Sequence, residues 1–340
     1  MALALATTAS AQENPLWLRH CAISPDGSTV AFAYKGDIYT VPATGGNARQ
    51  LTTNSAHDSY PVWSPDSKQL AFCSNREGSM DVYVMNREGG APRRLTTNSG
   101  TETPIAFKDN NTVLYVSSIM PTAQSILFAN GSLPQVYEVS TNASRPRLFS
   151  ALPMMDISIR PNGDLLYHDQ KGYEDPLRKH HRSPITRDIW LRRAGKYTKL
   201  TNFNGEDRTP VWAAQGDSFY YLSEEDGTFN VYKRNIDGTD KQQLTRHTTN
   251  PVRFLTAATD GTLCYGYDGE IYTLKQGAQP QKLKVNIVTD KTDKDLDRQT
   301  LFTGATEISL SPDGKELAFV LHGDVYVTSM DYRTTKQITD

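Results

Sequence analysis

The 340-residue sequence is poor in the residues that build disulfide frameworks and metal sites. Its only cysteines are Cys21, Cys73 and Cys264, an odd number without C-x-x-C spacing, and no H-E-x-x-H motif occurs. We therefore expect free cysteines buried in strands, and no bound metal. Residues 293, 295 and 297 are aspartates, as in the start of a calcium loop, but Arg298 stands where that loop requires glycine.

Long apolar runs and one-sided charge are also missing. Beyond the first dozen residues, no run approaches the roughly 18 apolar residues of a membrane helix, so no membrane span is expected. The 36 basic and 38 acidic residues give a net charge of −2, which does not favour a nucleic-acid partner. No G-x-S-x-G motif or triad spacing is present. We predict neither catalytic residues nor a cofactor, and the sequence leaves a homo-oligomer open.

The first eleven residues differ from the rest. An apolar run from Met1 to Ala6 precedes Ala9-Ser10-Ala11, a pattern typical of the end of a secretory signal peptide, although the basic segment that normally starts one is missing. We interpret residues 1–11 as a signal-peptide remnant and expect an exported, periplasmic protein. A frayed N-terminal tail is the alternative.

The main positive feature is a unit that recurs seven times, at intervals of 40 to 54 residues. Each unit begins with a turn rich in Asp, Asn and Gly, of which Ser24-Pro25-Asp26-Gly27 is the clearest example. A short apolar strand follows, such as Val30-Ala31-Phe32. Later in each unit comes an aromatic residue: Tyr39, Tyr83, Tyr137, Trp190, Tyr232, Tyr272 and Tyr326.

A nearly constant spacing links that aromatic residue to the end of its unit. Ten to twelve residues later stands an aliphatic residue, most often followed by threonine: Leu51, Leu95, Leu148, Leu200, Leu244, Leu283 and Ile338. Four short antiparallel strands per repeat describe the blade of a β-propeller, because one small sheet cannot bury both of its faces alone. We therefore predict an all-β protein built from four-stranded antiparallel blades.

The number of blades in the ring is less certain from the spacing. Residues 12–287 hold six units, residues 288–304 are rich in charge and read as a linker, and residues 305–340 hold the seventh unit. We favour a six-bladed propeller, a linker and the first blade of a second propeller that is cut short. A single seven-bladed ring is the alternative.

Units three and four carry insertions between their second and third strands, which should rise side by side on one face. Residues 117–133 are mostly apolar or small and predict a docking lip, with a loop folded onto its own blade as the alternative. The candidate lip residues are Ile119, Met120, Leu127 and Phe128.

The second insertion, residues 171–193, is rich in basic side chains. Guanidinium groups bind carboxylates and phosphates through paired donors, so this loop is the candidate peptide or carboxylate site. Its residues are Arg178, Lys179, His180, His181, Arg182 and Arg187. The alternative is a solvated loop whose charges pair with its own acids, Glu174, Asp175 and Asp188.

Two sets of motifs resemble known proteins. Val62-Trp63-Ser64-Pro65-Asp66, with Arg94-Leu95-Thr96 later in the same unit, resembles the propeller repeat of TolB-type periplasmic proteins and tricorn-type peptidases. Tyr167-His168-Asp169 and Thr186-Arg187-Asp188-Ile189-Trp190, together with the basic segment between them, resemble the N-terminal propeller of bacterial tricorn-like serine peptidases.

The tricorn-like resemblance implies a function. In that family a six-bladed and a seven-bladed propeller precede a helical bundle, a PDZ-like module and a serine-peptidase core that cleaves oligopeptides. The resemblance implies that this chain binds and filters peptides. Its expected partners are peptides or the catalytic domains of the parent peptidase, and the catalytic region is expected outside this chain. The basic loop would hold a peptide's terminal carboxylate. A TolB-like, non-enzymatic scaffold that contacts envelope proteins is the alternative function.

Overall fold

The computed structural model describes residues 15–119, 133–172, 178, 180, 182–288, 303–332 and 334–339, and the backbone of residues 12–13. Within these ranges the secondary structure consists of strands, with no helix. None of the described segments forms a helix long and apolar enough to cross a membrane. The chain divides into two compact units between Val288 and Thr289.

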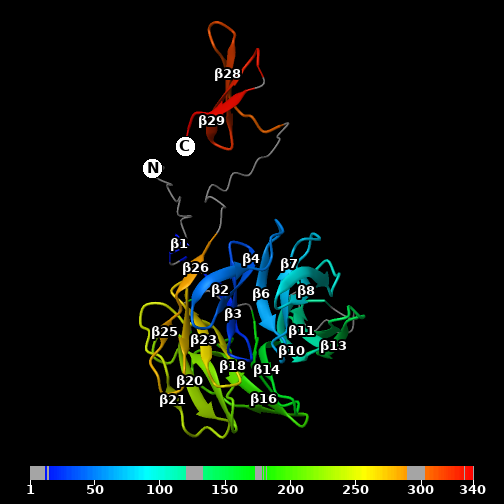
Figure 1. Ribbon diagram of the computed structural model, residues 1–340, viewed down its shortest axis with the longest axis vertical. Coiled ribbons are helices and arrows are strands. Elements are labelled where there is room, and N and C mark those ends of the chain that lie inside the picture. The colour runs from blue at the N-terminus through cyan, green and yellow to red at the C-terminus, as the bar shows by residue number, and fades with distance from the viewer. Residues whose placement is uncertain are drawn as a thin grey trace, which may run out of the picture. The chain divides into compact units, whose positions relative to one another are not determined.

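The first unit contains six antiparallel blades of four strands each, numbered one to six in chain order (Figure 1). Five of them are separate four-stranded sheets, and blade one is part of a six-stranded sheet. Blades one and two comprise β2 (Arg19–Ile23), β3 (Thr29–Tyr34), β4 (Asp37–Pro42), β5 (Gly46–Gln50), β6 (Asp58–Trp63), β7 (Gln69–Ser74), β8 (Asp81–Asn86) and β9 (Gly89–Arg94). Blades three and four comprise β10 (Thr103–Asp109), β11 (Thr112–Ser117), β12 (Gln135–Ser140), β13 (Arg147–Ser150), β14 (Met154–Ile159), β15 (Leu165–Asp169), β16 (Ile189–Arg193) and β17 (Lys196–Lys199). Blades five and six comprise β18 (Asp207–Trp212), β19 (Ser218–Ser223), β20 (Asn230–Asn235), β21 (Gln242–Gln243), β22 (Arg253–Ala257), β23 (Leu263–Tyr267), β24 (Glu270–Leu274) and β25 (Gln281–Lys282).

Two further strands join the two ends of this unit to blade one. β26 (Val285–Ile287) runs parallel to β5, with Val285 opposite Gly46, and β1 (Gln12–Glu13) pairs antiparallel with β26. Residues that follow blade six are therefore hydrogen-bonded to the outer strand of blade one. This pairing holds the start and the end of the ring together and covers an edge strand that would otherwise be open.

Apolar clusters fill the spaces between consecutive blades. Each of six clusters joins two neighbours, and one of them brings Val30 and Phe32 of blade one against Cys264 and Ile271 of blade six. The sheets thus bury both faces by packing on one another around a ring. The predicted all-β, blade-based fold class is confirmed, and the three cysteines are free and buried as predicted.

The repeated third-strand aromatic residue is explained by its partner on the second strand. Tyr39 lies opposite Phe32 in the β3–β4 register, and their ring centroids are 5.7 Å apart. Equivalent pairs in blades two, three, five and six lie 5.5–6.0 Å apart, a separation typical of favourable aromatic contacts. The second-strand members of these pairs are fully buried.

The threonine that ends most repeats has a structural role as well. In blade one, Thr52 Oγ1 accepts a hydrogen bond from the backbone N–H of Ile38, at 2.9 Å. Equivalent threonines in blades two, four and five accept from the third strand at 2.8–2.9 Å. Each replaces the backbone partner that the short fourth strand no longer supplies.

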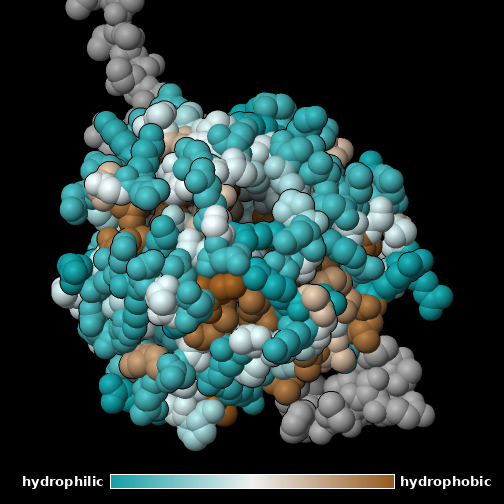
Figure 2. All heavy atoms as spheres, turned by 90° about the horizontal axis from the view of Figure 1, so that it is seen from below, coloured by the Kyte–Doolittle hydropathy of each residue, from teal (hydrophilic) through white to brown (hydrophobic). Residues whose placement is uncertain are grey.

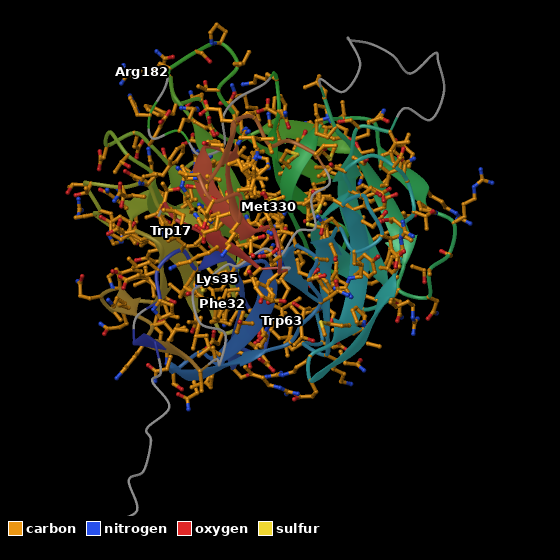
Figure 3. The ribbon with its side chains drawn as sticks, turned by 90° about the horizontal axis from the view of Figure 1, so that it is seen from above. Trp17, Phe32, Lys35, Trp63, Arg182 and Met330 are labelled. Carbon is orange, nitrogen blue, oxygen red and sulfur yellow. The ribbon has the colours of Figure 1, made fainter. Side chains whose placement is uncertain are left out.

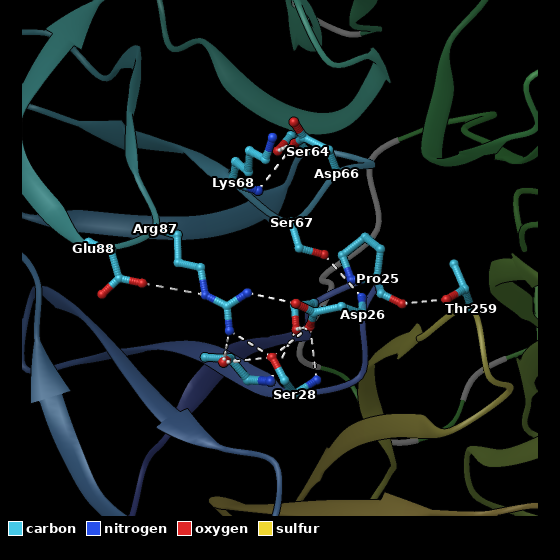
Figure 4. A network of polar contacts seen from close by, with 12 residues as sticks. Pro25, Asp26, Ser28, Ser64, Asp66, Ser67, Lys68, Arg87, Glu88 and Thr259 are labelled. Carbon is cyan, nitrogen blue, oxygen red and sulfur yellow. Dashed lines mark hydrogen bonds and ion pairs between the residues drawn. The ribbon is translucent and has the colours of Figure 1, made fainter.

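The turns that connect the first and second strands contact one another from blade to blade. Asp26 accepts hydrogen bonds from Ser24 and Ser28, while Gly27 takes the positive φ of 72° that the turn requires. Figure 4 shows how this turn reaches its neighbours: the Asp26 N–H donates to Ser67 Oγ in blade two, and the Thr259 hydroxyl of blade six donates to the Pro25 carbonyl.

The second unit contains one further four-stranded antiparallel sheet among its described residues. Its strands are β27 (Ile308–Leu310), β28 (Glu316–Leu321), β29 (Asp324–Ser329) and β30 (Thr335–Gln337). The blade-like pairing of Phe319 with Tyr326 recurs here, at 5.5 Å. Apolar residues such as Ile308 and Ile338 remain more than half exposed, in contrast to their equivalents in the first unit.

Candidate functional site

The basic insertion of blade four contributes two arginines to a buried cluster. Arg178 lies in the loop between β15 and β16, and Arg187 lies two residues before β16. Both form ion pairs with Glu206, which directly precedes the first strand of blade five; Arg187 Nη1 lies 3.4 Å from Glu206 Oε1. Glu206 is 1% exposed. The two predicted arginines are therefore brought together around a carboxylate of the next blade.

A second buried carboxylate completes the acidic part of the cluster. Glu224 follows β19 and is fully buried. Its Oε1 accepts a hydrogen bond from the Glu206 N–H at 2.9 Å, and its Oε2 lies 3.0 Å from His180 Nδ1 and 3.8 Å from Arg178. Because Glu224 binds the backbone of Glu206, it fixes the position of the first carboxylate.

Two more arginines reach the cluster from inner strands. Arg208, on β18, lies 3.5 Å from Glu206 Oε1, and its guanidinium also covers the ring of Phe229 at 4.0 Å. Arg253, at the start of β22, donates to the Arg178 carbonyl at 3.3 Å. Burial lowers the pKa of Arg208 to about 10, and the nearby Arg253 and Arg187 contribute to this shift while Glu206 opposes it.

Among the described residues, three guanidinium groups thus pair with the buried Glu206, and that of Arg253 contacts the Arg178 backbone beside them. Arg187 is 8% exposed, and its Nε–H has no hydrogen-bond partner. Buried donors are nearly always satisfied, so an unpartnered one calls for an explanation. A carboxylate of a bound molecule would supply both the missing acceptor and a compensating charge.

A buried histidine lies beside the same cluster. His168 of β15 is 2% exposed, and its Nδ1 accepts a hydrogen bond from the Thr209 N–H at 3.2 Å. Burial, together with Arg187 and Arg208, holds the pKa of His168 well below its ordinary value. The imidazole is therefore neutral and serves as an acceptor that orders the start of β18.

The other predicted residues of the basic loop are Arg182, Lys179 and His181. Arg182 is exposed and lies on the loop at the edge of the ring, away from the labelled core side chains (Figure 3). Lys179 and His181 lie outside the described residues, as do Glu174 and Asp175. Asp188, one of the loop's own acids, pairs with Lys171 of the same insertion, as the alternative expected, and also with Lys199 at 2.8 Å.

The predicted docking lip is described only at its first residue. Ile119 packs against the apolar cluster between blades two and three, and its carbonyl accepts a hydrogen bond from the Tyr137 hydroxyl. Met120, Leu127 and Phe128 lie outside the described residues. Figure 2 shows one face of the molecule, which is largely hydrophilic and carries several small hydrophobic patches.

Glu206, Glu224, Arg208 and Arg253 are the residues that the sequence did not point to. They come from three segments outside the insertion, and only the packing of blades four, five and six brings them together. Glu206 directly precedes an inner strand, as the buried Glu102 does in blade three. Within the described residues, no group of three or more potential metal ligands is arranged to hold an ion.

Comparison with known proteins identifies relatives of the whole first unit. Residues 15–280 match the family described as the tricorn protease N-terminal beta propeller domain. The chain is 28% identical over 271 residues to tricorn protease homolog 1 of Streptomyces coelicolor, covering 77% of this chain and 24% of that protein. It is 22% identical to the tricorn protease of Thermoplasma acidophilum, covering 90% and 28%. The chain thus spans about a quarter of the length of these relatives.

Solved structures agree with this assignment at the level of fold. The crystal structure of the tricorn protease superposes with a TM-score of 0.71 at 20% identity, covering 96% of this chain and 32% of that one. TolB from Acinetobacter baumannii superposes with a TM-score of 0.58 at 14% identity, covering 77% and 66%. The repeats, the blade architecture and the matched residues lead to one conclusion: this chain belongs to the family of tricorn protease N-terminal beta-propeller domains.

Proposed function

We propose that this chain is the peptide-binding and substrate-gating propeller of an exported, tricorn-like serine peptidase that degrades oligopeptides. Catalysis would be carried out by residues outside these 340. The observation that carries the proposal is the unpartnered Nε–H of Arg187 within a buried group of arginines. The C-terminal carboxylate of a peptide is the ligand that would satisfy this donor.

The proposal includes a domain organisation. Residues 12–287 would form a six-bladed propeller, residues 288–304 a linker and residues 305–340 the first blade of a second propeller. Two observations support it: an apolar cluster joins blade one to blade six, and the chain divides into units after Val288. The half-exposed apolar residues of the seventh sheet would be covered by further blades.

Peptides that differ only at the C terminus test the carboxylate role. We expect a short peptide with a free carboxylate to bind the full chain about tenfold more tightly than its amidated form, as measured by isothermal titration calorimetry. Arg187→Gln should abolish that preference, whereas Arg187→Lys should retain part of it. Circular dichroism and thermal unfolding would show that both variants are folded.

Arg182 offers a matched control in the same loop. It is exposed, whereas Arg187 is buried, so Arg182→Gln should bind both peptides as the unmodified chain does. Equal affinity for free and amidated peptides, or equal losses in Arg187→Gln and Arg182→Gln, would contradict the proposal.

A TolB-like interaction scaffold is the second candidate, based on the apolar insertion of blade three. Deleting residues 120–132 would test it by comparing the proteins captured from an envelope extract before and after the deletion. Loss of one defined partner, with unchanged peptide affinity, would favour the scaffold over the peptide-binding role.

A further inference from the structure

The innermost strands share an irregularity that the repeats of the sequence do not display. In five blades the register between the first and second strands shifts by one residue, which is a β-bulge. The two residues of each bulge stand opposite one buried second-strand aromatic residue. These aromatic residues are Phe32, Phe72, Tyr167, Tyr221 and Tyr265.

The first residue of each bulge is not glycine, although its backbone is left-handed. The φ values run from 47° to 58° at His20, Tyr60, Asp156, Thr209 and Phe254. Side-chain-bearing residues rarely occupy this region, and such strain gathers at functional sites. Its recurrence at one position of five blades shows that the fold imposes it, and that each bulge re-aims one side chain.

These side chains point toward a common axis. The first strands contact one another in succession, β2 with β6, then β10, β14, β18 and β22, and β22 contacts β2 again. His20 of blade one stacks on Tyr60 of blade two, with ring centroids 3.8 Å apart, and meets Phe254 of blade six at 5.0 Å edge to face. Three blades thus contribute one aromatic cluster.

The other side of the axis is polar. Thr209 Oγ1 donates to Asp156 Oδ2 at 2.7 Å. Burial raises the pKa of Tyr60, and Cys73 and Asp156 add to this shift while Arg19 opposes it.

The aromatic cluster has the properties of an incomplete site. Tyr60 is 45% exposed, and His20 Nδ1 is buried without a hydrogen-bond partner. Burial, with Arg19 and His57 nearby, lowers the pKa of His20 to about 4, so its ring is uncharged at neutral pH. An apolar stacking surface therefore lies beside one unsatisfied polar atom.

We propose that Phe254, His20 and Tyr60 form an axial aromatic subsite that binds an uncharged aromatic side chain of a peptide. A cationic side chain is a poorer fit, because the positive charge of Arg19 already acts on both His20 and Tyr60. The subsite rests on the proposed peptide-binding function and names its side-chain class. It uses no residue of the Glu206 cluster.

Blocked amino-acid amides test the subsite without involving the carboxylate. We expect N-acetylphenylalaninamide to bind the full chain roughly five- to tenfold more tightly than N-acetylalaninamide, by saturation-transfer NMR titration. Tyr60→Phe should retain this affinity and Tyr60→Leu should lose most of it. Tyr60→Gly should lose it as well, although glycine relieves the left-handed backbone and leaves the fold intact.

Tyr197 provides the matched control, since it is a tyrosine of similar exposure, 41%, on the outer strand β17. Tyr197→Leu should leave binding unchanged. Equal binding of the two amides, or equal losses in Tyr60→Leu and Tyr197→Leu, would overturn the subsite. If neither amide binds while peptides with a free carboxylate still bind more tightly, the subsite is wrong and the proposed function stands. Arg187→Gln should leave the affinity for both amides unchanged.

Discussion

Blades three and five place a buried glutamate at the same position, with opposite surroundings. Glu102 and Glu206 each directly precede the first strand of their blade, and each is 1% exposed. Glu206 is paired with three arginines. Glu102 instead lies near the carboxylate of Asp81, and burial together with that charge raises the pKa of Glu102 to about 7.

The difference shows how one repeat position acquires two chemistries. The backbone of the blade fixes the position of the glutamate, and in both blades this position is buried from solvent. The neighbours decide how the carboxylate is accommodated. Two arginines of the blade-four insertion and one of the inner strand β18 pair with Glu206, whereas Glu102 lies near another carboxylate, that of Asp81. The basic site is therefore confined to the side of the ring formed by blades four to six.

Removing the blade-five carboxylate should have the largest effect. We expect Glu206→Gln to lower the free energy of unfolding by about 3–5 kcal/mol, because it leaves buried guanidinium groups without their shared partner. Urea unfolding followed by circular dichroism would measure the loss. Glu88→Gln is the control, since Glu88 pairs with Arg49 at the surface and should cost less than about 1 kcal/mol. Similar losses of unfolding free energy in Glu206→Gln and Glu88→Gln would contradict the special role of Glu206.

Neutralising the blade-three carboxylate should act in the opposite direction. Between its ordinary pKa of 4.5 and its folded pKa of about 7, Glu102 keeps a proton in the folded state that the unfolded chain has lost. Stability from this group is therefore lost as pH rises through that window. Glu102→Gln should raise the free energy of unfolding at pH 8 on the order of 1 kcal/mol, allowing for solvent screening.

The pH dependence of this gain is the measurement that matters. Denaturant unfolding at pH 5 and pH 8 should show a larger gain for Glu102→Gln at pH 8. A gain of equal size at both values, or a loss at pH 8, would mean that Glu102 is stably ionised and that the two blades do not differ as described.

The smallest expected effect comes from simple carboxylates. If the Glu206 cluster binds an anion, sodium acetate should raise the thermal unfolding midpoint above its value in sodium chloride of equal ionic strength. Binding near its dissociation constant supplies less than about 1 kcal/mol. Scanning calorimetry would detect the shift, which Arg187→Gln should remove and Glu102→Gln should leave in place. Identical midpoints in both salts would remove the support for a carboxylate site.

Most of the fold could be predicted from the repeat pattern of the sequence. The turn at Asp26-Gly27, the aromatic residue at Tyr39 and the threonine at Thr52 each occupy a position that the blade geometry requires, so their spacing predicted the strands. The pairing of β26 with β5 was not predicted, because a three-residue strand in a charged context carries no periodic signal.

The candidate site was predicted only in part. Charge density singled out Arg178 and Arg187, which pair with Glu206, but equally pointed to Arg182, which is exposed. Single residues such as Glu206 and Arg208 leave no pattern in the sequence, since their importance comes from neighbours in another blade. The bulge residues His20 and Phe254 are likewise far apart in the chain and meet only when the ring closes.

The sequence by itself determined the local unit, because turn chemistry, alternation of apolar residues and the aromatic pair all act within about forty residues. Only the tertiary structure decided which side chains share a buried site. At the same position of the blade, one buried glutamate is paired with arginines and the other has a raised pKa, according to the groups that lie within a few ångströms. Those neighbours are set by blade packing rather than by sequence distance.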